Sequence, residues 1–215
     1  MKTFIDQPDK KQVLAAATGN HHKIEEITAV LSPLGIRVIS KDEAGARDFD
    51  PDETGDTFEE NSYIKARALL DMTGQPSIAD DSGLEVNALG GAPGVLSARF
   101  SSEDEPTGES TDKRNNTRLL HLLEYVPDED RTARFVCVIT ALWPDGRQIV
   151  SRGECCGHIL RVASGAGGFG YDPLFVPDEF AAEGLSFADI SAEQKNRISH
   201  RARALAAFAA ELAKL

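Results

Sequence analysis

The chain contains 215 residues, of which 23 are Lys or Arg and 35 are Asp or Glu, so its net charge is −12. This length is enough to bury a substantial core in one globular unit. The negative charge repels a nucleic-acid backbone, and the sequence has neither a run long and apolar enough to span a membrane nor the apolar segment of a signal peptide. We therefore expect a soluble, cytoplasmic protein that binds neither nucleic acid nor membranes.

The cysteines and histidines form no familiar metal or disulfide pattern. The three cysteines are odd in number and contain no Cys-x-x-Cys pair. The five histidines lack the His-x-x-x-His spacing of a zinc site. Any metal ion is therefore expected to be a hard cation that oxygen atoms bind.

Apolar periodicity predicts strands that alternate with helices. Short apolar or β-branched runs indicate strands, whereas apolar residues three or four apart indicate helices. The predicted strands lie at 13–17, 36–39, 84–89, 134–143 and 148–150, and the predicted helices lie at 24–34, at 57–71, around 119–123 and from about 199 onward. The last two strands flank a Pro-Asp-Gly turn and form a hairpin. The predicted class is α/β with a mixed sheet.

Two polar segments are predicted to lie outside these elements. Residues 1–11 have the composition of a flexible leader, which leaves residues 12–215 as a single domain. Residues 101–112 are rich in Ser, Glu, Asp, Gly and Thr, so we expect a mobile surface loop there. The helix at 57–71 has clearer signals, because Thr57 and Glu60 have the spacing of a capping box.

The segment TGNHHK, residues 18–23, joins the first predicted strand to the first predicted helix. A helix N-terminus exposes unpaired backbone N–H groups and a partial positive charge. Gly19 and Asn20 could let the backbone approach a phosphate, while Lys23 adds charge. The alternative is an ordinary turn with an exposed lysine.

The segment GAGGFGYDPLF, residues 165–175, contains the spacing Gly-x-Gly-x-x-Gly. It is not a dinucleotide-binding fingerprint, because Pro173 prevents a helix from starting where that motif requires one. Phe169 and Tyr171 could stack on a nucleobase. They could equally be core residues beside a turn, and the segment alone does not separate the two interpretations.

The segment QKNRISHRARAL, residues 194–205, places Lys195, His200 and Arg201 around the start of the last helix. Ser199 suits the N-cap position, which puts the His and Arg side chains in the first turn. Cations at a helix N-terminus oppose the helix dipole, and this unfavourable placement favours a functional role. A solvated basic face is the alternative.

The vicinal carboxylates Asp80 and Asp81 precede the strand predicted at 84–89. Together with Glu53 from the acidic loop at 48–56, they could hold a hard cation. Magnesium characteristically takes one or two carboxylates plus substrate phosphates. Taken alone, such a pair is more often part of a turn or a cap.

Five segments in order resemble the inosine triphosphatase-like pyrophosphatases of non-canonical purine nucleoside triphosphates. They are TGNHHK, ETGDTFEENSYIKA, ADDSGLEVNALGGAPGVLSARF, GGFGYDPLF and KNRISHRARAL, and the resemblance runs from Leu14 to about Leu205. It implies an elongated mixed sheet with flanking helices and two lobes about a central substrate cleft, usually in a homodimer. It also implies Mg²⁺-dependent hydrolysis of ITP, dITP and XTP to the monophosphate and pyrophosphate, which cleanses the nucleotide pool.

The resemblance assigns roles residue by residue. Asp81 would be the catalytic carboxylate, and the Mg²⁺ ligands would be Glu53, Asp80 and Asp81, with the choice of direct ligand between the two aspartates left open. The substrate-binding residues would be Thr18, Gly19, Asn20, His21, His22, Lys23 and Lys65 for the triphosphate, Ser82 lining the site, and Phe169, Gly170, Tyr171, Asp172, Lys195, His200 and Arg201 for the base and sugar. The departures from the family pattern at Ser62, Asn87 and Ala163 remove none of these groups.

Base selection follows from hydrogen-bond donors. If His200 and Arg201 face purine position 6, their N–H groups would donate to a keto oxygen, whereas an adenine amino group there would be unpaired at a cost of about 1–3 kcal/mol. Guanine carries the same keto oxygen, and the sequence does not explain its exclusion. Three alternatives stay open: a related pyrophosphatase with another base preference, a nucleotide-binding regulatory protein without turnover, and a structural module without Mg²⁺-dependent nucleotide binding.

Overall fold

The computed structural model describes residues 12–103 and 111–214, so the predicted leader lies outside the described residues. The chain divides into two compact units. The first takes in the described residues up to Asp81, then Val138–Arg152 and the described residues from Ala204 onward. The second comprises Ser82–Cys137 and Gly153–Arg203.

Within the described residues, six strands form one sheet in the order β2-β1-β3-β4-β5-β6. The strands are β1 (Gln12–Ala16), β2 (Ile36–Ser40), β3 (Ser77–Val86), β4 (Thr132–Leu142), β5 (Gln148–Ile159) and β6 (Phe175–Pro177), and the helices are α1 (His21–Leu31), α2 (Phe58–Thr73), α3 (Asp112–Leu122), α4 (Ala192–Ile198) and α5 (His200–Leu212). β1 pairs in parallel with β2 and β3, whereas β5 and β6 are antiparallel. The predicted mixed sheet with flanking helices is confirmed. None of the helices in the described ranges is both long and apolar enough to cross a membrane.

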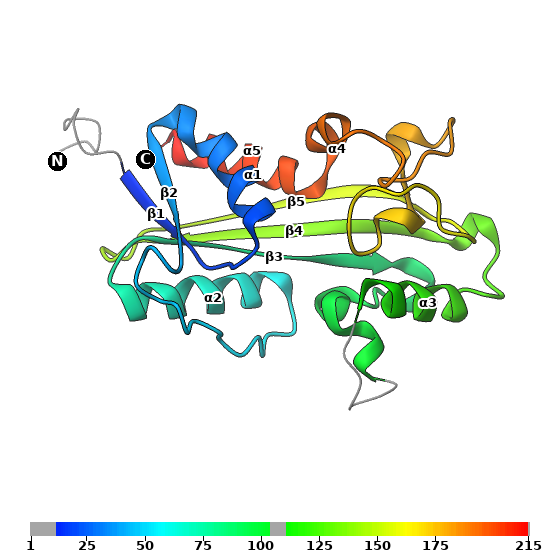
Figure 1. The fold of residues 1–215 in the computed structure, drawn as a ribbon, viewed down its shortest axis with the longest axis horizontal. Coiled ribbons are helices and arrows are strands. Elements are labelled where there is room, and N and C mark those ends of the chain that lie inside the picture. Colours follow the sequence, from blue (N-terminus) through cyan, green and yellow to red (C-terminus); the bar gives the residue numbers. More distant parts are fainter. Residues whose placement is uncertain (1–11, 104–110, 215) are drawn as a thin grey trace. The chain divides into compact units, whose positions relative to one another are not determined.

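The first unit packs helices on both sides of its strands. In Figure 1, α2 lies on one side and most of α5 on the other. The core between α2 and the strands includes Leu69, Ala79 and Leu142. The predicted capping box is present: the side chain of Thr57 accepts from the amide of Glu60, whose carboxylate accepts from the Thr57 amide. The start of α2 is therefore set by local sequence.

The second unit has an aromatic core. The ring of Phe135 lies 4.8 Å from that of Phe175 and 5.8 Å from that of Phe187. In Figure 1, α3 and α4 lie on opposite sides of the strands of this unit. Burial of these rings supplies the apolar driving force for this half of the chain.

A buried arginine joins the ends of several elements in the second unit. The guanidinium of Arg131 donates to the carbonyl oxygens of Ile159 at 2.8 Å, Leu123 at 2.6 Å and Leu160 at 2.8 Å. Arg131 is 2% exposed. Its buried charge is therefore solvated by three backbone carbonyls.

One predicted boundary is wrong in a way that matters for function. The strand predicted at 84–89 instead spans Ser77–Val86, and residues 87–89 form a 3₁₀ turn. Asp80 and Asp81 therefore lie inside a strand and not at a junction between elements. Aspartate is depleted in strands, and the prediction consequently placed the strand start too late. Lysine partners compensate the two charges, as described below.

The predicted loop at 101–112 is also shorter than expected. Its first residues close a 3₁₀ segment, Gly94–Glu103, its last residue begins α3, and residues 104–110 lie outside the described residues. Asn115 holds the 3₁₀ segment, because its side chain accepts from the amide of Ser101 at 2.8 Å and donates to the carbonyl of Ala98 at 3.2 Å. Likewise, the second hairpin strand continues to Ile159, well beyond the predicted residue 150.

Replacing Arg131 tests whether it holds the second unit together. Arg131→Met would remove three hydrogen bonds between a buried guanidinium and backbone carbonyls, and we expect a loss of roughly 3 kcal/mol or more in the free energy of unfolding. Arg67→Met removes an exposed charge paired with Asp71 at 2.9 Å, and should cost less than about 0.5 kcal/mol. Urea unfolding of both variants measures the difference. Equal stabilities would show that Arg131 contributes little.

Candidate active site

Three parallel strands bring polar residues to one edge of the first unit. Ala16 of β1 is in register with Ser40 of β2 and Ile78 of β3. Because the strands are parallel, the residues that follow these positions lie at the same carboxyl edge, the usual ligand-binding edge of such sheets. The Thr18–Lys23 turn follows β1 at this edge. Asp80 lies two residues past Ile78, on the part of β3 that extends beyond its pairing with β1.

Two lysines form ion pairs with three carboxylates at this edge. The ammonium group of Lys65 lies 2.6 Å from Asp81 and 2.9 Å from Glu53. The ammonium group of Lys23 lies 3.0 Å from Asp80. Asp80, Asp81 and Lys65 are all buried. These ion pairs explain how an interior strand tolerates two consecutive aspartates, because buried charges persist only when they are paired.

The environment shifts the protonation equilibria of both partners. Burial lowers the pKa of Lys65, but Asp81, Asp80 and Glu53 together raise it above its ordinary value. The lysine therefore stays charged. Burial raises the pKa of Asp81, and the charges of Glu53 and Asp80 raise it further, although Lys65 opposes the shift. A raised pKa makes this carboxylate a stronger base, which suits it to accept a proton from water.

A pocket of about 220 Å³ lies beside these ion pairs in the first unit. Its lining residues are Ala17, Thr18, Gly19, Lys23, Lys41, Phe49, Asp50, Pro51, Glu53, Lys65 and Asp80. Asn20 shapes the turn, since its amide donates to the Thr18 hydroxyl at 3.1 Å and its side chain accepts from the Lys23 amide at 3.3 Å. Backbone N–H groups and lysine ammonium groups thus line the same pocket, and donors of both kinds bind phosphate groups.

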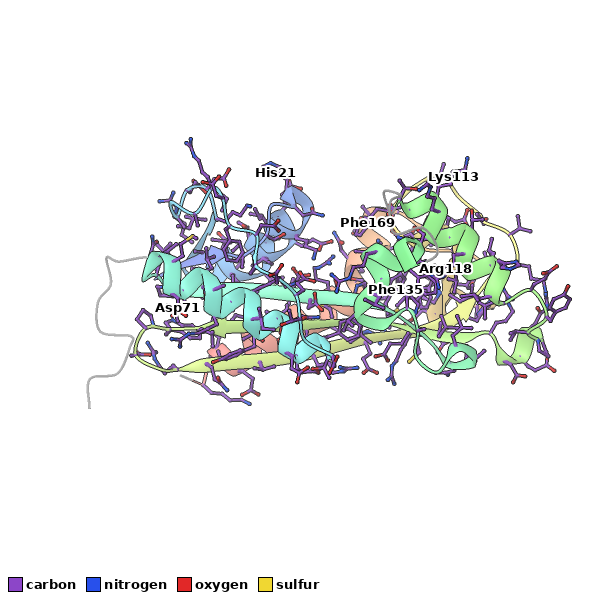
Figure 2. All side chains as sticks on the ribbon, turned by 90° about the horizontal axis from the view of Figure 1, so that it is seen from below. His21, Asp71, Lys113, Arg118, Phe135 and Phe169 are labelled. Carbon is purple, nitrogen blue, oxygen red and sulfur yellow. The ribbon has the colours of Figure 1, made fainter. Side chains whose placement is uncertain are left out.

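Of the two histidines in the TGNHHK segment, the structure describes the side chain of His21 alone. His21 is exposed at the start of α1, as Figure 2 shows, and does not belong to the described lining. The side chain of His22 lies outside the described residues. The phosphate-cradle interpretation of the segment therefore depends on Thr18, Gly19, Asn20 and Lys23.

The carboxylates are compatible with a hard metal ion. Among the described residues, no group of three or more His, Cys, Asp and Glu side chains forms a ready-made metal site. Magnesium needs only one or two carboxylates when substrate phosphates complete its coordination. Glu53, Asp80 and Asp81 offer oxygen ligands of that kind, whereas a transition metal would favour nitrogen or sulfur ligands.

In the second unit, a glycine loop presents one aromatic ring. Phe169 is 50% exposed, and the ammonium group of Lys195 lies 4.6 Å from its ring centroid. Asp172 fastens the loop, because its carboxylate accepts from the amide of Phe169 at 2.9 Å and from Lys195 at 2.5 Å. Gly168 is required here: its φ is +72°, and a Cβ would lie 2.2 Å from the Asp172 carboxylate.

Helix α3 holds the same loop from the other side. The amide of Gly170 donates to Asp112 at 2.7 Å, and its carbonyl accepts from the side chain of Asn116 at 3.0 Å. Figure 2 shows Phe169 near Lys113, which follows Asp112 on this helix. Sequence reasoning missed both contacts, since neither helix residue belongs to a recognised segment.

Tyr171 has a different environment from Phe169. It is 4% exposed, and its hydroxyl donates to the carbonyl of Ser97 at 2.8 Å. Burial raises its pKa. Of the two interpretations that the sequence left open, the structure therefore places Tyr171 in the core and leaves Phe169 available for stacking.

His200 and Arg201 at the start of α5 are buried, so the alternative of a solvated basic face is wrong for these two residues. His200 stacks on Phe135 with ring centroids 4.9 Å apart. Arg201 donates to the hydroxyl of Ser82 at 3.2 Å. Ser199 accepts from the amide of Ala202 at 3.2 Å, as predicted for an N-cap. Ser82 directly follows Asp81 in the chain, so this contact links a predicted base-reading residue to the strand that carries the acidic pair.

The sequence profile of the Ham1 family matches residues 14–211. The chain belongs to the Ham1 family. A relative from Desulforamulus reducens, named dITP/XTP pyrophosphatase, is 47% identical over 192 residues, which cover 89% of this chain and 91% of the relative. A relative of the same name from Salmonella typhimurium is 47% identical over 197 residues, covering 90% and 94%. The resemblance inferred from the five segments is confirmed.

Solved structures of the Ham1 family share the fold. The Ham1 protein of Staphylococcus aureus is 38% identical with a TM-score of 0.83, covering 94% of this chain and 99% of that protein. A HAM1 protein of Coxiella burnetii is 35% identical with a TM-score of 0.84, covering 95% and 100%. The mixed α/β architecture is therefore the family fold.

The ion pairs of the first unit predict unequal effects of removing either partner. Lys65→Gln would remove the cation that lies 2.6 Å from Asp81 and 2.9 Å from Glu53, and should lower the free energy of unfolding by about 3 kcal/mol. Asp81→Asn leaves Lys65 paired with Glu53 and removes repulsion from Asp80, so it should cost less than about 1 kcal/mol. Denaturant unfolding at neutral pH compares them, with the exposed Lys214→Gln as a control. A larger loss in Asp81→Asn would contradict this account.

Proposed function

We propose that this Ham1-family protein hydrolyses non-canonical purine nucleoside triphosphates, namely ITP, dITP and XTP, to the monophosphate and pyrophosphate. The observation that carries the proposal is the cluster in which the buried Lys65 bridges Asp81 and Glu53 beside the Thr18–Lys23 segment. Relatives that are 47% identical are named dITP/XTP pyrophosphatase. The protein would thereby remove damaged purines from the nucleotide pool.

The first unit would bind the triphosphate through an exchange of ionic partners. Lys23 and Lys65 contact carboxylates in the structure, and we propose that both turn to phosphate oxygens when substrate enters. Glu53, Asp80 and Asp81 would then hold Mg²⁺, which supplies charge neutralisation and polarises a water molecule. The backbone N–H groups after Thr18 would donate to the phosphates without adding further charge.

Asp81 would carry the proton transfer. Its raised pKa favours acceptance of a proton from the attacking water. The water oxygen would form a bond to the α-phosphorus while the bond from that phosphorus to the α–β bridging oxygen breaks. The bridging oxygen would leave with pyrophosphate, and the nucleoside monophosphate would keep the new oxygen. Lys65 would stabilise charge on the phosphates during this displacement.

The second unit would recognise the base. The exposed ring of Phe169 offers a stacking surface, and its loop is held rigid by Asp172 and Lys195. His200 and Arg201 would donate to the keto oxygen at purine position 6. An adenine amino group in the same place would leave donors unpaired at a cost of about 1–3 kcal/mol. Ser82, Gly170 and the backbone of Tyr171 would complete this side of the site.

We further propose that the two units work as one catalytic domain, and that the protein is a cytoplasmic homodimer. The family resemblance supports these assignments. The net charge of −12 supports a small-molecule substrate with no nucleic-acid partner.

Product analysis tests the reaction directly. The purified chain, supplied with Mg²⁺, should release pyrophosphate from dITP and XTP much faster than from dGTP, dATP or dUTP. Release of orthophosphate would place cleavage at a different phosphorus and contradict the proposal. A preference for dUTP would favour the alternative of a pyrophosphatase with another base preference.

Asp81→Asn separates an enzyme from a nucleotide-binding regulatory protein. We expect kcat to fall by about 10²-fold or more, the size of a lost general base, while the affinity for dITP stays within a few-fold. Asp71→Asn is the matched control, because Asp71 lies on the exposed face of α2 (Figure 2). Unchanged turnover in Asp81→Asn would remove the catalytic role from this residue.

A further inference from the structure

A third lysine lines the pocket of the first unit and belongs to none of the five segments that carry the family resemblance. Lys41 directly follows β2 and shares the lining with Lys23 and Lys65. A Cβ built at Gly19 would lie 3.7 Å from Cε of Lys41, so the end of this side chain lies against the TGNHHK turn. The lysine is therefore part of the same pocket wall as the predicted phosphate cradle.

The ammonium group of Lys41 contacts a different kind of partner from those of Lys23 and Lys65. Lys23 is paired with Asp80, and Lys65 with Asp81 and Glu53. Within the part of the chain that the structure describes, Lys41 has no carboxylate within 4.0 Å. Its ammonium group donates to the carbonyl of Phe49 at 2.8 Å. An ammonium group has three N–H donors, so this contact leaves capacity for an anion.

The sheet register indicates which part of a triphosphate Lys41 can reach. β1 separates β2 from β3, and neighbouring strands lie about 4.8 Å apart, so Lys41 and Asp80 start from strands roughly 10 Å apart. A nucleotide whose α-phosphate lies at the Asp80–Asp81 pair would extend its remaining phosphates past the end of β1 toward β2. Lys41 lies at the far side of this path.

We propose that Lys41 binds the pyrophosphate part of the substrate, a contact that rests on the proposed function and extends it. The lysine donates a charge-assisted hydrogen bond to oxygens of the two phosphates that leave together. Since its charge is not compensated by a carboxylate, no ion pair has to be broken when the anion binds. The same contact retains the pyrophosphate product until release.

Binding of inorganic pyrophosphate without nucleotide isolates this contact. Isothermal titration calorimetry on the full chain should show affinity about tenfold weaker for Lys41→Met than for the unaltered protein, as expected for one lost charge-assisted hydrogen bond. Lys41→Arg keeps the charge and should retain most of the affinity. Arg37→Met is the matched control, because Arg37 is an exposed cation on the same strand and pairs with Glu43 outside the pocket.

Several outcomes would overturn the inference. If the unaltered protein does not bind pyrophosphate, or if Arg37→Met weakens binding as much as Lys41→Met, Lys41 has no specific contact. If Lys41→Met lowers kcat for dITP while pyrophosphate affinity is unchanged, the lysine acts only by tethering the loop at Phe49. Loss of affinity in Lys41→Arg as large as in Lys41→Met, with both variants folded by circular dichroism, would also contradict a charge contact.

The two proposals fail separately. Pyrophosphate affinity that depends on Lys41, together with no turnover of any nucleotide by the unaltered protein, would remove the enzymatic function and keep the anion contact. Normal turnover of dITP, together with a pyrophosphate affinity that Lys41→Met does not change, would keep the enzymatic function and remove the Lys41 contact.

Discussion

The pairing of Lys65 with Asp81 and Glu53 is the interaction on which the first unit depends. Strand β3 carries two consecutive aspartates into the interior, and an unpaired buried carboxylate costs several kcal/mol. Lys65 reaches Asp81 because α2 packs along the strand, and the capping box at Thr57 sets the start of this helix. The capping box sets the start of α2, and the packing of α2 brings Lys65 to the charge that it compensates.

The same ion pairs give the site its chemical character. In the absence of substrate, Lys65 stabilises Asp81 and Glu53, and the nearby carboxylates keep Lys65 charged by raising its pKa. A polyanionic substrate offers each lysine a new negative partner, and a hard cation offers each carboxylate a new positive partner. The charge balance of the pocket can therefore be kept while its contents change, which suits an acidic protein that must bind a triphosphate.

In the second unit, an aromatic ring is exposed on a loop that hydrogen bonds hold in place. Asp172 and Lys195 hold the loop from one direction, and Asp112 and Asn116 hold the backbone of Gly170 from another. Phe169 is left at the surface, whereas Tyr171 fills the core. Rigid presentation lowers the entropy that the loop would lose when a base stacks on the ring.

The sequence by itself determined the elements that have strong local signals. The capping box of α2, the hairpin turn after β4, the N-cap at Ser199 and the family motifs are all read from a few neighbouring residues, and all match the structure or the family. The strand that holds Asp80 and Asp81 was placed too late, because strand propensity disfavours aspartate. Only the tertiary structure decided that these charges are buried, that Tyr171 is core while Phe169 is exposed, and that Lys41 joins the pocket. Each depends on partners more than fifteen residues away or on burial, and local sequence carries no signal for either.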